Sequence, residues 1–151
     1  MDAVTYPESK VIAFVNEHFI SVRLPFDAQP YAADFNIKWT PSIITLDQNG
    51  KEHHRTVGFL APEELIPSLY LGIGKSWFDS DQMDEALLYF DNLLTEYPKS
   101  DFDAEALYFR GVSRFKSTHD PKPLRETYEE LNTKFPNSEW TKRAYPYRLL
   151  N

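Results

Sequence analysis

The fold is decided by residues 86–98, ALLYFDNLLTEYP, whose pattern of apolar residues and proline returns at residues 124–136, LRETYEELNTKFP. At this offset of 38 residues the matching positions continue into the next segment. They are Phe90 and Tyr128, Leu93 and Leu131, Tyr97-Pro98 and Phe135-Pro136, Ser100 and Ser138, Phe102 and Trp140, and Ala106 and Ala144. A fixed period of this length is typical of stacked supersecondary units. The alternative is an ordinary helical hairpin domain with a coincidental repeat.

Each repeated unit is predicted to be a helix, a turn and a second helix. The apolar residues of the first copy recur at helical spacing, and Pro98 ends the run because proline cannot continue a helix. Upstream, Gly74 matches Gly111 at an offset of 37. Phe78 matches Phe115 at the same offset, so the change by one residue falls between Phe78 and Ala86, where a turn tolerates an insertion.

These positions resemble the tetratricopeptide repeat, which has small, aromatic, alanine and proline residues at this spacing. The resemblance implies that the following residues pack the repeats together: Gly74, Trp77, Ala86, Phe90, Pro98, Gly111, Tyr128 and Pro136. The second copy departs from the pattern, with Arg114 at the aromatic position and Leu124 in place of alanine. Residues 138–150 resemble the first helix of a third unit that caps the array. Residues 67–151 are thus expected to form about two repeats plus a capping helix.

The composition predicts a folded chain that does not bind polyanions. Of its 151 residues, 42% are hydrophobic, and the net charge is −7 without a basic stripe, which argues against nucleic acid and anionic membranes as partners. No apolar run is long enough to span a membrane and no signal-peptide pattern is present, so a cytoplasmic setting is the default expectation. The sequence contains no cysteine, which excludes disulfides, thiolate nucleophiles and thiolate metal sites from this chain.

The first seventy residues follow a different pattern, in which helices alternate with strands. The apolar spacing predicts a helix at about 8–18, a short helix at 30–36 and a helix that begins near Pro62. Alternating or apolar runs predict three strands, at Ile20–Leu24, Ser42–Asp47 and Glu52–Gly58. Asn49-Gly50 predicts a hairpin between the last two because both residues accept a positive φ.

This order of elements resembles the C-terminal two-thirds of a thioredoxin fold. Thr40-Pro41 is similar to that family's cis-proline loop, and the resemblance implies that Trp39, Thr40 and Pro41 bind an extended peptide. The alternatives are a trans Pro41 that starts a strand, and a Trp39 that lies in the core or at a domain interface. The family's Cys-x-x-Cys segment is lacking. We hypothesise that the chain starts at an internal methionine, inside the helix that would carry those cysteines.

The resemblances divide the chain into an incomplete thioredoxin-like domain, residues 1–66, and tetratricopeptide-like repeats, residues 67–151. The fold class expected is therefore a partial α/β sheet of three strands followed by an all-helical region, with a helix shared by the two. In the thioredoxin family another strand lies between those that correspond to Ile20–Leu24 and Ser42–Asp47. Its absence leaves an open edge, so we expect a homodimer or a partner strand that completes the sheet.

Other candidate sites are weak. His53 and His54 are adjacent on a strand and are expected to point to opposite faces, as an exposed pair rather than a metal site. The acidic run Asp79-Ser80-Asp81 with Asp84-Glu85 is interpreted as helix capping, because it lacks the glycine and glutamate of a calcium loop. No phosphate-binding loop is present, and no metal or cofactor is expected.

Two functions remain open. The first is a non-catalytic protein-interaction module that binds protein or peptide. The second is the C-terminal part of a thioredoxin-family thiol–disulfide oxidoreductase, with a role in cell redox balance, whose cysteines lie upstream of Met1.

Overall fold

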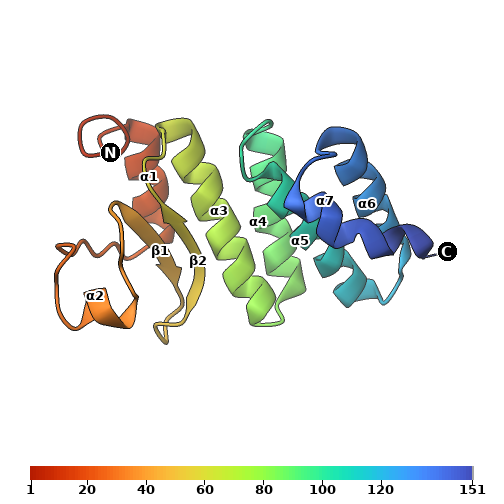
Figure 1. Ribbon diagram of the computed structural model, residues 1–151, viewed down its shortest axis with the longest axis horizontal. Helices are drawn as coiled ribbons and strands as arrows, with labels where there is room; N and C mark the ends of the chain where they lie inside the picture. Colours follow the sequence, from red (N-terminus) through yellow and green to blue (C-terminus); the bar gives the residue numbers. More distant parts are fainter. Residues whose placement is uncertain (151) are drawn as a thin grey trace.

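The computed structural model of the chain describes residues 1–150, and Figure 1 shows it as a ribbon. This part of the chain is mainly helical, with 57% helix and one small antiparallel sheet. Its helices are α1 (Ser9–His18), α2 (Tyr31–Asp34), α3 (Pro62–Asp79), α4 (Met83–Glu96), α5 (Asp103–Thr118), α6 (Lys122–Lys134), α7 (Glu139–Ala144) and the 3₁₀-helix η1 (Tyr145–Leu149). Its strands are β1 (Ser42–Leu46) and β2 (Glu52–Val57).

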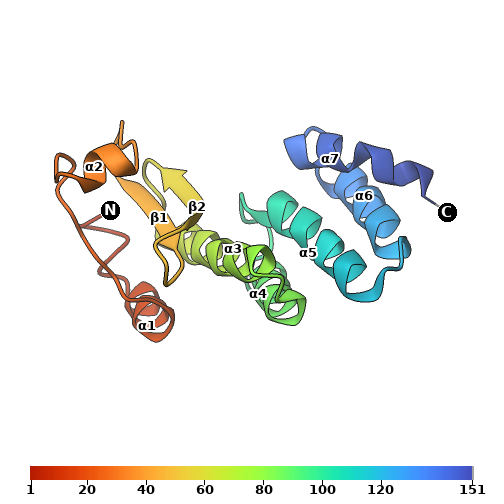
Figure 2. The same cartoon turned by 90° about the horizontal axis from the view of Figure 1, so that it is seen from below.

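The sheet has two strands, so the prediction of three strands is wrong. Residues 20–24 leave α1 as exposed chain, and their backbone makes no hydrogen bond with the backbone of any other described residue. Figures 1 and 2 show this segment passing β1 on the side away from β2 on its way to α2. An alternation of apolar and polar residues is typical of a strand. A strand forms in a sheet, however, only where the edge of a neighbouring strand lies within hydrogen-bonding reach.

β1 and β2 form the predicted hairpin, and α3 covers one of its faces. Gly50 takes φ +79 in the connecting turn. The register runs from Ser42 opposite Val57 to Thr45 opposite His54, and it then shifts by one residue. On the covered face Thr45 touches α3 at Gly72, where a methyl group would lie 3.0 Å from Thr45 Cβ. This close contact fixes the sheet against the helix.

The helical part consists of two helix pairs side by side, α3 with α4 and α5 with α6, followed by α7 and η1 (Figure 1). A glycine lets the helices of each pair approach. Gly74 faces the ring of Phe90, and Gly111 faces the side chain of Thr127, so a methyl group at either glycine would overlap its neighbour. The second contact therefore uses Thr127, the residue before Tyr128, although the repeat pattern matches Phe90 to Tyr128.

One hydrophobic core runs through both parts of the chain. Its fully buried members come from four helices, with Val11 in α1, Leu71 in α3, Phe90 in α4 and Ala106 in α5, and Ile43 of β1 packs against it. A smaller cluster around Leu131 holds α5, α6 and α7 together. The expected boundary between residues 66 and 67 lies inside α3, which contributes to the sheet and to the helix pairs alike.

Candidate functional site

The Trp39–Pro41 loop lies directly before β1 and is open to solvent. The Thr40–Pro41 peptide bond is cis, as expected. Within the described chain, Pro41 O accepts from Gly58 N at 2.8 Å and Trp39 O accepts from Ser42 Oγ at 2.6 Å, whereas the backbone N–H and C=O of Thr40 have no backbone partner. Trp39 is 70% exposed, so its interpretation as a core or interface residue is wrong.

Large exposed apolar side chains concentrate in the N-terminal part of the chain. Of the sixteen, twelve lie between residues 4 and 59 and four in the helical part. We name seven of the twelve the N-terminal apolar residues, which are Ile20, Val22, Leu24, Phe26, Trp39, Val57 and Phe59. Ile20 is 97% exposed, close to the maximum for any residue. Where such side chains form one contiguous patch, they mark a surface that binds other molecules or aggregates.

The two histidines of β2 are buried, and both contact α3, so the prediction of an exposed pair on opposite faces is wrong. The register shift places them beside each other, since a bulge lets two consecutive residues oppose one residue of the partner strand. No feature of the local sequence pattern predicts this register shift.

His53 lies between two carboxylates and joins the hairpin to the end of α3. Its Nδ1 is 2.6 Å from Asp79 Oδ2, and its Nε2 is 3.1 Å from Asp47 Oδ2. The hydrogen bond with His53 is the main cause that lowers the pKa of the Asp47 carboxyl. Among residues 1–150 no cluster of three or more His, Cys, Asp or Glu side chains is arranged to hold a metal.

His54 forms a second polar contact with α3. Its Nε2 is 3.1 Å from Ser68 Oγ, and Lys75 Nζ is 3.5 Å from its Nδ1. Burial lowers the pKa of His54 to about 4, and the Lys75 charge acts in the same direction. Lys75 also donates to Glu105 Oε1 at 2.8 Å, so this contact extends from the sheet to α5.

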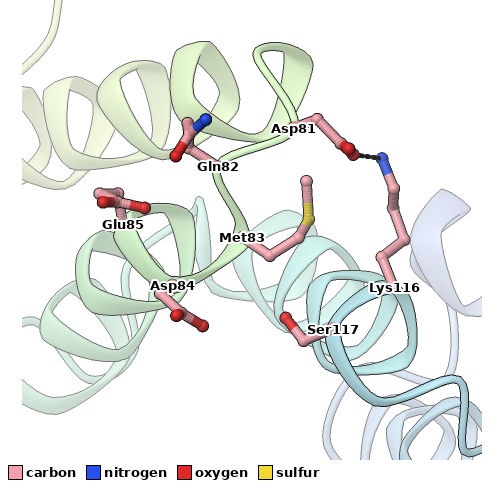
Figure 3. Close-up of a pocket in the computed structure, with 7 residues that line it drawn as sticks. All are labelled: Asp81, Gln82, Met83, Asp84, Glu85, Lys116 and Ser117. Carbon is pink, nitrogen blue, oxygen red and sulfur yellow. Dashed lines mark ion pairs between the residues drawn. The ribbon is translucent and has the colours of Figure 1, made fainter.

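The acidic residues around the α3–α4 turn line a small hollow of about 330 Å³, drawn in Figure 3. Asp81 carries an ion pair to Lys116 of α5 at 2.7 Å, while Asp84 and Glu85 lie in the first turn of α4. The residue that caps α4 is Gln82, and its side chain makes no capping hydrogen bond. In the same run, Ser80 is the C-cap residue of α3, and its Oγ donates to Ser76 O at 2.9 Å. The interpretation of the run as helix capping is therefore confirmed for Ser80 at the end of α3 and wrong for the start of α4, where Gln82 is the N-cap residue.

The residues expected to pack the repeats occupy several environments. Ala86 and Phe90 are fully buried, and Gly74 and Gly111 lie at the helix contacts. Trp77 is 39% exposed. Tyr128 is half-buried and packs edge-on against Tyr145, with 6.0 Å between the two ring centroids. Pro98 and Pro136 each follow the C-cap residue of a helix, Tyr97 after α4 and Phe135 after α6.

Comparisons with known proteins do not identify a relative, since no protein-family model, curated protein or solved structure matches this chain. In the part of the chain that the structure covers, no helix is both long and apolar enough to cross a bilayer.

Proposed function

We propose that this chain is a non-catalytic protein-interaction module in which an incomplete thioredoxin-like half is joined to tetratricopeptide-like helices. The concentration of exposed apolar side chains at the N-terminal end carries this proposal. A monomeric protein exposes single apolar residues everywhere, but it rarely gathers most of them in one part. The helical part, which carries four of the sixteen, serves as the rigid support.

The backbone around these residues favours an extended partner. β1 pairs with β2 on one edge, and its other edge has no neighbour among the described strands. The Thr40 peptide groups and residues 20–24 are also free of backbone partners in residues 1–150. A free strand edge binds an added strand through its main chain, and the flanking side chains then supply specificity.

A second copy of the chain is the partner that can be tested first. We expect the average mass in light scattering to rise from one chain toward two as the concentration is raised. The double variant Ile20→Lys with Val22→Lys should remain monomeric, because two charges on the exposed segment oppose burial. Leu88→Lys is the matched control, since Leu88 is 57% exposed on α4, far along the chain from this surface.

A chain that stays monomeric at high concentration would contradict self-association. If Leu88→Lys abolished association as effectively as the double variant, the surface would have been placed wrongly. Both variants change exposed positions, so circular dichroism should show unchanged helix content and thus separate loss of binding from loss of folding.

A further inference from the structure

A second hollow, of about 760 Å³, lies between α4, α5 and α6. Figure 1 shows these three helices next to one another, on the far side of α3 from the sheet. We call it the α4–α6 hollow. Its wall carries three basic residues, Lys99, Arg110 and Lys134, and three acidic residues, Asp101, Asp103 and Glu130. The charges balance, which favours an occupant without net charge.

Two buried polar atoms in the wall of this hollow lack hydrogen-bond partners. Residues 1–150 contain three such side-chain atoms, and Asp103 Oδ1 and Arg110 Nε are two of them. The other groups of both residues are engaged, because Asp103 Oδ2 accepts from Lys99 N at 2.8 Å and Arg110 Nη2 donates to Glu130 Oε2 at 2.7 Å. Buried polar atoms are nearly always paired, so an unpaired acceptor and an unpaired donor bordering one hollow require an explanation.

The spacing of Asp103 and Arg110 along α5 suits an extended peptide. Asp103 and Arg110 are seven residues apart on α5, which places them on one face about 10 Å apart along the axis. An extended chain that rises about 3.3 Å per residue covers this distance in about three residues. Between them, Ala104 and Leu107 form an apolar floor. The complementary ligand has a donor at one end, an acceptor at the other and an apolar group between.

We propose that the α4–α6 hollow binds an uncharged, extended segment of about three residues from a partner protein. A peptide N–H donates to Asp103, a peptide C=O accepts from Arg110 Nε, and a central aliphatic side chain rests on Ala104 and Leu107. Asp103 Oδ1 and Arg110 Nε are shielded from water in the free chain. Binding therefore requires both side chains to turn toward the segment. Burial raises the pKa of the Asp103 carboxyl, in keeping with its incomplete hydrogen bonding. This site is independent of the N-terminal apolar residues.

The test is a titration of the ¹⁵N-labelled full chain with the capped tripeptide acetyl-Ala-Leu-Ala-amide, followed by NMR. We expect saturable shifts centred on the amides of Ala104, Leu107 and Arg110, and weaker binding of acetyl-Ala-Ser-Ala-amide, which lacks the aliphatic group. Arg110→Lys keeps the charge but loses Nε, and it should weaken binding at least about fivefold. Arg114→Lys is the matched control on the same helix and should bind as the unchanged chain does.

Asp103→Asn is a second variant for the same titration. It should also weaken peptide binding, because its side-chain amide can place an N–H donor where the peptide N–H needs an acceptor. If that variant fails to fold, Arg110→Lys alone decides the matter. The proposal is overturned if the leucine peptide produces no saturable shifts, if the shifts centre on the hairpin or on residues 20–26, or if Arg110→Lys binds the peptide as tightly as Arg114→Lys.

Discussion

At the scale of single residues, the two interhelical glycines leave no space for a side chain. At Gly111 a new methyl carbon would lie 2.7 Å from Thr127 Cβ, and threonine, branched at Cβ, cannot turn away as a long side chain would. We expect Gly111→Ala to lower the free energy of unfolding by about 1 kcal/mol in urea titrations, because overpacking outweighs the gain in helix propensity.

The control for this change removes the obstacle. In a Thr127→Gly background the methyl group of Gly111→Ala no longer meets the Thr127 Cβ, hydroxyl or methyl, so the same substitution should be neutral or stabilising. An equal loss in both backgrounds would show that the Gly111–Thr127 contact is not what requires glycine.

His54 gives the chain a dependence on pH that can be assigned to one residue. Its pKa of about 4 in the folded chain is below the ordinary value of 6.5, so neutral His54 favours the folded state above pH 6.5. This contribution is lost as the pH falls from 6.5 toward 4, and between pH 7.5 and 5 the loss amounts to about 2 kcal/mol. Urea titrations at these two pH values should show a smaller loss for His54→Gln.

The exposed His119 provides the comparison for this pH effect. It lies after α5 with φ 58, a conformation that asparagine also accepts, so His119→Asn should keep the full dependence on pH. If His54→Gln and the unchanged chain lost the same free energy between pH 7.5 and 5, the buried imidazole would not be the group responsible.

At the scale of elements, His53 is the connection between the hairpin and the end of α3. Asp47 accepts the backbone N–H groups of Asn49 and Lys51 with one oxygen and meets His53 with the other. His53→Phe keeps an aromatic side chain but removes both nitrogen contacts, so we expect the hairpin amides to exchange with solvent about tenfold faster. Hydrogen exchange followed by NMR measures this directly.

A surface ion pair on the same strand serves as the control for His53. Arg55 forms a fork with Glu52 at 2.6 and 2.8 Å on the exposed side of β2, and such pairs contribute little. Arg55→Gln should therefore leave the exchange rates of the hairpin nearly unchanged. Equal acceleration by both variants would mean that any loss of charge loosens β2.

The elements that the sequence predicts well are those whose pattern is complete within one segment. The stripe of Phe90 and Leu93 suffices for α4, and Asn49-Gly50 suffices for the hairpin. The strand expected at residues 20–24 was wrong because a strand depends on a neighbour that the segment itself does not encode. The burial of His53 and His54 depends on a register shift between two strands. The α4–α6 hollow was missed because three helices meet there.

At the scale of the whole molecule, α3 makes the two parts one body. It covers the sheet through Gly72 and packs α4 through Gly74, and the main core extends from α1 to α5 across it. Leu94 packs against both this core and the C-terminal cluster. The sheet and the helical part are therefore continuous through α3 rather than joined by a flexible linker.

This continuity predicts a single cooperative unfolding transition. Leu71→Ala removes a fully buried side chain from the middle of α3, and it should cost about 2–5 kcal/mol through the cavity it leaves. Because the core is shared, NMR signals from the hairpin and from α5 should disappear at the same urea concentration, lower than in the unchanged chain by the same amount. Leu88→Ala, at an exposed site on α4, should shift neither midpoint appreciably. Loss of the hairpin signals in Leu71→Ala while those of α5 persist would show instead that the sheet and the helices fold as separate units, and that α3 merely connects them.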